Sequence, residues 1–431
     1  MNKFITISLC SSILLLHFIG FIFIPIDPNV TNKIIIISGG ISFLIVISNV
    51  KILFTSNPGI PFFYTLLILG FVNLLWYGFY KSSDSLYVNA YRGYLEMGKI
   101  AVFGAFSFLV LTSTNVSEVM KNHKIHLIVA AIGQVICFGC AFYQGVYLGV
   151  DRIPLSAMSG VAGEMGAATI AAYMLTFSSG YATLVLLRSD IRYKTLLFSL
   201  NFFLSFSAII MTGTRAAIIA YPVMIIMMLI IDSKVNSLNM KKACLPLLAL
   251  FIICGFIFKD QINERVKYFH SDISNYEKEN SDTSIGARLA MIEAGVASSY
   301  KNFFFQSLEK RADAIKSLND LNNNKFYGAT VFLNVHLHNE IVEALSTKGI
   351  FGVILLFLFY FSLIRYIIKI REPILLSFVL AMFLFGLSDV IMHAKPIPSS
   401  WIITLYLSCA FLLASKKSGG QVESGATANN K

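Results

Sequence analysis

Arg215 stands at the start of an apolar segment, and its position suggests anion chemistry. It follows Thr212, Gly213 and Thr214 and precedes residues 216–231, which carry almost no charge. A guanidinium stays protonated at every accessible pH, so its placement at a membrane boundary is costly unless an anion or another functional partner is present. The Thr-Gly-Thr turn would let backbone amides approach that anion, and a helix beginning here would direct its positive end toward it. We predict that Arg215 binds an anion; the alternative is a boundary arginine that extends to lipid headgroups.

Arg288 is a second candidate, within the segment Thr283-Ser284-Ile285-Gly286-Ala287-Arg288-Leu289. Ser284 is expected to cap the helix that follows. An arginine near the first turn of a helix is unfavourable against the helix dipole unless an anion lies there too. The alternative is a solvated loop arginine, and on the residues alone that is the simpler interpretation.

The third candidate is a pair of histidines in Val335-His336-Leu337-His338-Asn339-Glu340. Histidine is the side chain best suited to accept a proton near neutral pH. His336 and His338 are two residues apart and would not share a helix face, so we expect one in a loop and the other at a helix start. A zinc site is the rival interpretation, but it needs further ligands, and His270 is the only other histidine in this region. We therefore predict no metal.

These residues need a scaffold, and the composition indicates one embedded in a membrane. Of the 431 residues, 56% are hydrophobic and only 13% are charged. Apolar runs of about 20 residues, the length that crosses a hydrocarbon core of roughly 30 Å, recur along the chain. A β-barrel would instead have strands of about ten residues with alternating polarity. The predicted fold class is all-α, a polytopic integral membrane protein.

We expect about twelve transmembrane helices, so both chain ends lie on one side. The expected spans are roughly 4–24, 34–54, 60–80, 97–113, 125–147, 162–187, 195–212, 215–231, 243–258, 349–369, 373–392 and 399–415. With the N-terminus inside, sixteen Lys and Arg residues fall in cytoplasmic segments and seven in short outer loops, while eleven lie in one long outer loop that the positive-inside rule discounts. We therefore attribute the net charge of +11 to loop residues that set the membrane topology, and we predict no nucleic-acid partner.

The long outer loop gives the chain its domain organisation. We expect transmembrane helices 1–9 in residues 1–258, a helical periplasmic loop domain in 259–348, helices 10–12 in 349–415 and a disordered cytoplasmic tail in 416–431. Within the loop, Tyr300-Lys301-Asn302-Phe303-Phe304-Phe305 fits an amphipathic helix on the membrane surface. Packing of these phenylalanines against the loop's own helices is equally open.

Two fixed cations and a histidine on one outer face fit a particular chemistry, the transfer of a glycosyl group from a polyprenyl pyrophosphate. The arginines would bind the pyrophosphate and stabilise the charge that develops as it leaves. The histidine would deprotonate an acceptor hydroxyl. Without a metal, arginine must supply all of the leaving-group stabilisation.

At these residues the chain resembles the O-antigen ligase family, within the wider O-antigen ligase and polymerase superfamily. The motifs are Thr212-Gly213-Thr214-Arg215, the loop arginine Arg288, and His338-Asn339 with Leu345 and Gly349 downstream. The resemblance covers nearly the whole chain, including about twelve spans and one large periplasmic loop late in the sequence.

The resemblance implies a metal-independent, cofactor-free inverting glycosyltransferase of the GT-C-like integral-membrane type. It would move O-antigen polysaccharide from undecaprenyl pyrophosphate to an outer-core sugar of lipid A–core, in the bacterial inner membrane with its active site facing the periplasm. Catalytic roles are implied for His338, Arg215 and Arg288, and substrate contacts for both arginines, His336 and Asn339.

Asp389 is a further candidate for substrate binding, in the eleventh expected span near its outer side. An ionisable residue within the membrane is a functional candidate by default. The alternative is that it pairs with a nearby cation such as Lys395, and the sequence leaves both interpretations open.

Two other functions compete with the ligase. An O-antigen polymerase, or a ligase that attaches glycan to protein, belongs to the same superfamily; polymerases tend to carry two large outer loops, whereas this chain has one. A polysaccharide flippase is a different class of protein and should carry charges deep in several spans. Here most charges lie at the outer edge and in one loop, which favours surface chemistry.

Overall fold

The computed structural model describes residues 3–49, 57–113, 123–155, 167–236, 240–278, 280–300, 303–394 and 396–428. Within these ranges all regular structure is helical. A helix stands at each of the twelve expected spans: α1 (Lys3–Phe23), α2 (Pro28–Ser48), α3 (Ile60–Tyr80), α4 (Val88–Leu111), α6 (His123–Phe142), α7 (Ala167–Arg188), α8 (Lys194–Met211), α9 (Arg215–Asn236), α10 (Met240–Ile257), α15 (Glu340–Ile370), α16 (Leu376–Ser388) and α17 (Ile397–Ala428).

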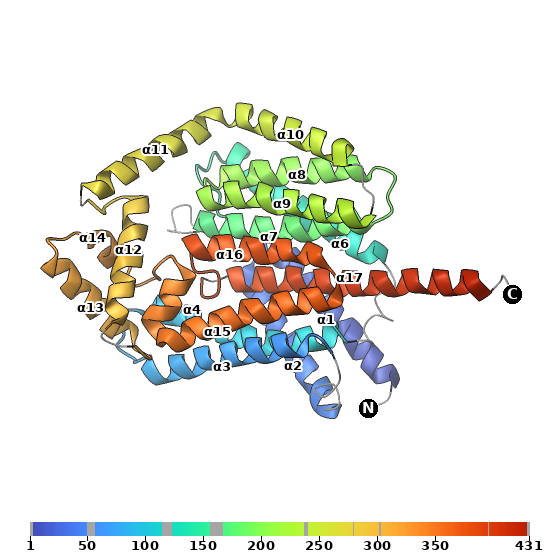
Figure 1. Ribbon diagram of the computed structural model, residues 1–431, viewed down its shortest axis with the longest axis horizontal. Helices are drawn as coiled ribbons and strands as arrows, with labels where there is room; N and C mark the ends of the chain where they lie inside the picture. Colours follow the sequence, from blue (N-terminus) through green and yellow to red (C-terminus); the bar gives the residue numbers. More distant parts are fainter. Residues whose placement is uncertain are drawn as a thin grey trace.

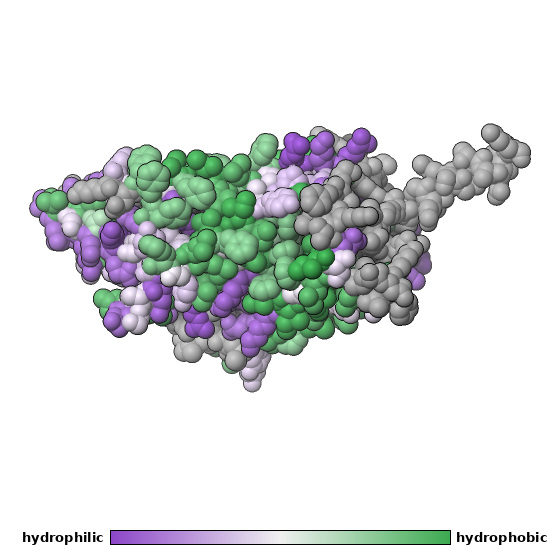
Figure 2. Space-filling model, turned by 90° about the horizontal axis from the view of Figure 1, so that it is seen from below, coloured by the Kyte–Doolittle hydropathy of each residue, from purple (hydrophilic) through white to green (hydrophobic). Residues whose placement is uncertain are grey.

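The helices have the length and composition of membrane spans. Among the residues searched, nine are long and apolar enough to cross a membrane, and Ile7–Phe23 and Pro373–Ser388 form shorter apolar helices. Figure 2 shows the matching surface, on which hydrophobic residues dominate the middle of the molecule and hydrophilic ones gather toward the end that carries the long loop. The predicted all-α, polytopic membrane class is confirmed.

The spanning helices run side by side along the long axis of the molecule, around α7 and α17 (Figure 1). These two helices are the most completely buried of the candidate spans. The start of α1 and the end of α17 lie at one end of the bundle, and the long loop lies at the other (Figure 1). This is the arrangement that the twelve spans expected from the sequence predict.

The long loop is helical, as expected. It contains α11 (Lys259–Glu277), α12 (Ser284–Ser299), α13 (Leu308–Leu321) and α14 (Tyr327–Val331). Helices α12–α14 share an apolar core with the ends of α3 and α4, in which Trp76 and Tyr91 pack with Met291 and Ile315. Because this core joins loop to bundle, the loop forms a fixed cap over one end of the spanning helices.

The phenylalanine-rich stretch differs from both of its sequence interpretations. Residues 303–306 form no helix, and Phe303 and Phe304 are 60% and 69% exposed, so they do not pack in the loop's core. Lys301 and Asn302 lie outside the described residues. The cause is backbone pairing with α15: the Ile350 N–H donates to the Phe303 carbonyl, and the Gln306 N–H donates to the Thr347 carbonyl.

Helix α17 also differs from the expected domain organisation. It continues through residues 416–428, for which the sequence predicts a disordered tail. That stretch contains no proline, so every residue can supply the N–H that helical hydrogen bonding needs, and the helix extends beyond the span.

Helix α15 contains a kink at Gly349, at the expected boundary between the loop domain and the tenth span. Gly349 has φ 63° and ψ −155°, a conformation that is essentially restricted to glycine. A Cβ atom there would lie 2.1 Å from the Phe303 carbonyl oxygen. The kink divides α15 into a short segment under the cap, Glu340–Lys348, and a longer segment that spans the bundle.

Replacing Gly349 with alanine should therefore destabilise the protein. The backbone conformation alone costs a non-glycine residue roughly 1–3 kcal/mol, and the Phe303 carbonyl must also move. We expect a lower thermal unfolding midpoint in detergent. Gly78→Ala is the matched control, because nothing lies within 4 Å of its added Cβ, and alanine inside a helix is favoured over glycine by about 0.5–1 kcal/mol. Equal midpoints for the two variants would contradict this account of the kink.

Candidate active site

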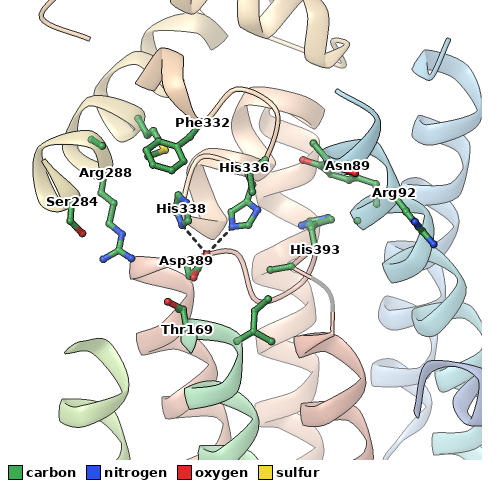
Figure 3. Close-up of a pocket in the computed structure, with 18 of the residues that line it drawn as sticks. Asn89, Arg92, Thr169, Ser284, Arg288, Phe332, His336, His338, Asp389 and His393 are labelled. Carbon is green, nitrogen blue, oxygen red and sulfur yellow. Dashed lines mark hydrogen bonds and ion pairs between the residues drawn. The ribbon is translucent and has the colours of Figure 1, made fainter. Parts of the chain in front are cut away.

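A cavity of about 560 Å³ lies between the cap and the ends of the spanning helices. Four of the six predicted functional positions line it directly: His336, His338, Arg288 and Asp389. Figure 3 shows Arg288 reaching from α12 toward the group formed by His338 and Asp389, with Asn89 and Arg92 on the opposite wall. The cavity therefore gathers residues from the cap, the bundle and the segments that join them.

Asp389 is the centre of the site. Its Oδ1 atom lies 2.9 Å from His336 Nε2 and 3.1 Å from His338 Nδ1, and it also accepts the Val390 N–H at 2.8 Å. The Asp389 side chain is 6% exposed. Burial alone would raise the pKa of Asp389, but the two histidines hold that pKa well below its usual range. The carboxylate is thus ionised and fixed.

These contacts define which nitrogen of His338 is available for chemistry. A carboxylate accepts hydrogen bonds, so Nδ1 of His338 carries the proton that is donated to Asp389. The other nitrogen, Nε2, then keeps its lone pair. Burial lowers the pKa of His338 below its ordinary value, and Asp389 only partly offsets this. The imidazole is therefore neutral near pH 7 and competent as a base.

Both histidines lie in the loop before α15, which corrects the expectation that one would begin the helix. Asn339 is the N-cap: its side-chain oxygen accepts the N–H groups of Ile341 and Val342. His338 has φ 47°, in the left-handed region. Because of this turn, His336 and His338 reach the same carboxylate oxygen, although residues two apart on a regular helix would point in different directions.

Asp389 lies just beyond α16, which ends at Ser388, and not within the eleventh span. Its partners are the two histidines; Lys395, the cation suggested by the sequence, lies outside the described residues.

Asn339, a predicted substrate contact, does not line the cavity, since its amide oxygen caps α15 and its Nδ2 donates to the Leu387 carbonyl. A direct contact of Asn339 with substrate stays a prediction.

Arg288 presents a guanidinium to the cavity from the second turn of α12. The N-cap of this helix is Thr283, whose hydroxyl accepts the Gly286 N–H, and not Ser284 as expected. Arg288 is half-buried, and no carboxylate among the described residues lies within ion-pair distance of it. A cation held in this state is available to an anionic ligand.

Arg215 has the predicted local structure but lies outside the cavity lining. Gly213 has φ 64°, and α9 begins at Arg215 directly after the turn. The Arg215 guanidinium pairs with Asp272 of α11 at 3.5 Å. The turn still borders the cavity, because the cavity-lining residue Arg152 donates its Nε–H to the Thr212 carbonyl at 3.0 Å.

Arg152 and Arg92 line the cavity, and the sequence interpretation did not assign them a role in the site. Both were counted only as charges of short outer loops that set topology. The sequence could have pointed to these two arginines only because short outer loops contain few cations, all on the same predicted side as Arg215. It does not show which of those cations faces the cavity.

His336, His338 and Asp389 also have the residue types of a metal site, and their ligand atoms lie within 4.8 Å of one another. The third donor that the sequence did not supply is therefore Asp389, 51 residues from His338, and not His270. In the structure both histidines donate to one oxygen of Asp389, at 2.9 and 3.1 Å, which are ordinary hydrogen-bond distances.

The fold and the cavity define a polytopic membrane protein with a histidine–carboxylate group beside fixed positive charge. Comparison with known proteins gives its family. A model of the family described as O-antigen ligase matches residues 200–357. The chain is also 33% identical over 339 residues to the O-antigen ligase of Escherichia coli (strain K12), covering 78% of this chain and 77% of the relative. The chain belongs to the O-antigen ligase family, and the resemblance found in the sequence is confirmed.

The hydrogen bond from His338 to Asp389 predicts a specific pH effect. The carboxylate raises the pKa of His338, so Asp389→Asn should lower that pKa further. An imidazole accepts a proton only when it is neutral. If His338 is the base, the acid limb of the kcat/KM profile should therefore move to lower pH in the variant. The maximal rate should fall by about 10²-fold or more, since the amide no longer fixes the Nδ1–H tautomer. A shift of the acid limb to higher pH would contradict this arrangement.

Proposed function

We propose that this protein is an O-antigen ligase that transfers O-antigen polysaccharide from undecaprenyl pyrophosphate to an outer-core sugar of lipid A–core. The observation that carries the proposal is one cavity in which His338, oriented by Asp389, lies near the unpaired guanidinium of Arg288. A base and a fixed cation are the two groups that this transfer needs when no metal assists it.

In this reaction the acceptor hydroxyl loses its proton to His338 Nε2 as its oxygen bonds to the anomeric carbon of the donor sugar. The bond from that carbon to the pyrophosphate oxygen breaks on the opposite face, so the configuration at carbon inverts. The pyrophosphate leaves with the bonding electron pair. Arg288, with Arg152 on the cavity wall, stabilises the charge that develops on it. The proton on His338 then passes to solvent.

Arg215 would contribute to the donor side of this cavity from the turn at residues 212–214. Its partner Asp272 is 3.5 Å away, a long and partly exposed contact that a doubly charged pyrophosphate can replace. The start of α9 adds backbone N–H groups and a positive helix end beside it. In this scheme Arg288 neutralises the leaving group, whereas Arg215 and the turn hold the anion.

The proposed location is the bacterial inner membrane, with the cavity facing the periplasm and both termini in the cytoplasm. Two observations support this orientation. The cap lies at the end of the bundle opposite the termini (Figure 1). Its helix α12 contributes Ser284, Ala287 and Arg288 to the cavity lining, so the cavity lies at that end too. The Lys and Arg residues of the short loops are concentrated on the side of the termini, as cytoplasmic loops require.

A complementation experiment tests the proposal. In a strain that lacks this gene, wild type should restore the long-chain lipopolysaccharide ladder on a gel, whereas His338→Ala and Arg288→Ala should reduce it about 10²-fold or more, because each removes one of the two catalytic groups. Lipid-linked polymer should accumulate. The matched controls are His270→Ala and Lys316→Ala, which remove exposed residues of the same loop outside the cavity lining, and both should restore the ladder.

Two results would overturn the proposal in different ways. A deletion strain with core plus a single repeat unit would identify a polymerase, which uses the same donor but a different acceptor. Surface polymer that is unaffected by every variant would exclude glycosyl transfer and favour a flippase. Membrane insertion of each variant is checked by immunoblot of the membrane fraction.

A further inference from the structure

The loop that carries the two histidines is hydrogen-bonded to a buried carboxylate, that of Glu343, on the side away from the cavity. The Leu337 N–H, between His336 and His338, donates to Glu343 Oε2 at 2.8 Å. The Leu337 side chain is 0% exposed and packs in the core of the cap. Leu337 is therefore anchored through both its backbone and its side chain, and its two neighbours project to the opposite side, into the cavity.

Glu343 is itself fixed by two further side chains. Arg311 of α13 lies 2.9 Å from Oε2, and both side chains are 0% exposed. The Tyr94 hydroxyl of α4 donates to the other oxygen, Oε1. One carboxylate thus joins the cap through α13, the bundle through α4, and the histidine loop. Its position in space is therefore set by α4 and α13 as well as by α15, the helix on which it lies.

The backbone at His338 explains why such an anchor is needed. A non-glycine residue at φ 47° is strained by about 1–3 kcal/mol, and this conformation persists only where the surroundings impose it. The Asn339 cap holds the backbone on one side of His338, and the bond from Leu337 to Glu343 holds it on the other. Without the second bond the loop can relax, and the His338 ring leaves the Asp389 carboxylate.

We propose that Glu343, held by Arg311 and Tyr94, is a positioning residue that sets His338 against Asp389 for proton transfer. The inference rests on the proposed function of His338 as the base. Glu343 does not line the cavity and would touch neither donor nor acceptor. Its effect on the reaction is geometric, and a displacement of about 1 Å is enough to cost as much as 10²-fold in rate.

The alternative is that the ion pair only stabilises the fold. Two double variants separate the roles, and each removes both charges so that no buried ion is left alone. In Arg311→Met with Glu343→Gln, the amide oxygen still accepts the Leu337 N–H. In Arg311→Met with Glu343→Leu, that acceptor is absent. The two variants are matched in charge and close in volume, and they differ in whether the histidine loop is tethered.

The measurement is steady-state transfer by the purified full-length protein, with its thermal unfolding midpoint. The glutamine variant should keep kcat within about threefold of wild type, and the leucine variant should lose about tenfold or more with the donor KM changed less than twofold. The acid limb of the pH profile should move toward pH 6.5 in the leucine variant only, because the released His338 loses the burial that lowers its pKa. Equal kcat losses that follow the unfolding midpoint in both variants would overturn the proposal.

A milder variant covers the case in which the leucine protein does not fold. Glu343→Asp keeps the charge opposite Arg311 but withdraws the carboxylate from the Leu337 N–H. A lower kcat at unchanged donor KM and unchanged unfolding midpoint supports positioning, and wild-type kcat contradicts it. His338→Ala serves as the reference: if it transfers at the wild-type rate, the proposed function has failed, whereas an inactive His338→Ala with fully active Glu343 variants refutes only the positioning role.

Discussion

The shared hydrogen bonding of one Asp389 oxygen to His336 and His338 is the interaction on which the site depends. A buried carboxylate is costly unless it is hydrogen-bonded, and here two imidazoles and the Val390 N–H donate to its Oδ1 atom. In return the carboxylate fixes the tautomer of His338 and leaves its outer nitrogen free. The tautomer and the orientation of His338 follow from this contact, whereas its neutrality at pH 7 follows from burial, which lowers its pKa more than Asp389 raises it.

At the cap end of the bundle, three separate chain segments meet around the Asp389–histidine contact. Helix α16 ends at Ser388 and presents the carboxylate, α15 begins at Glu340 and presents the histidine loop, and α12 presents Arg288 from the cap. The kink at Gly349 lets one helix serve both the cap and the bundle. A cap that shares an apolar core with α3 and α4 holds these segments in place relative to one another.

The residue types in the sequence were sufficient to predict the spans and the helix start at Arg215, and to select His338 as a candidate that the structure places in the cavity lining. These features depend on local composition and spacing. The pairing of Asp389 with the histidines was not predictable, since it depends on where two helices end in space, 51 residues apart. That both histidines share one partner was also not predictable, because it depends on the positive φ of His338, which the sequence does not reveal. Arg152 and the fully buried pair of Arg311 and Glu343 were indistinguishable in sequence from ordinary loop charges.

The most direct test of the account is chemical rescue of the missing base. Purified His338→Ala protein is assayed for transfer of lipid-linked polysaccharide to lipid A–core, with EDTA present and imidazole added at increasing concentration. We predict that the residual rate rises with imidazole, and that the rise follows the neutral fraction of imidazole as pH changes. Transfer by His338→Ala at the wild-type rate without imidazole would contradict the claim that His338 takes the proton.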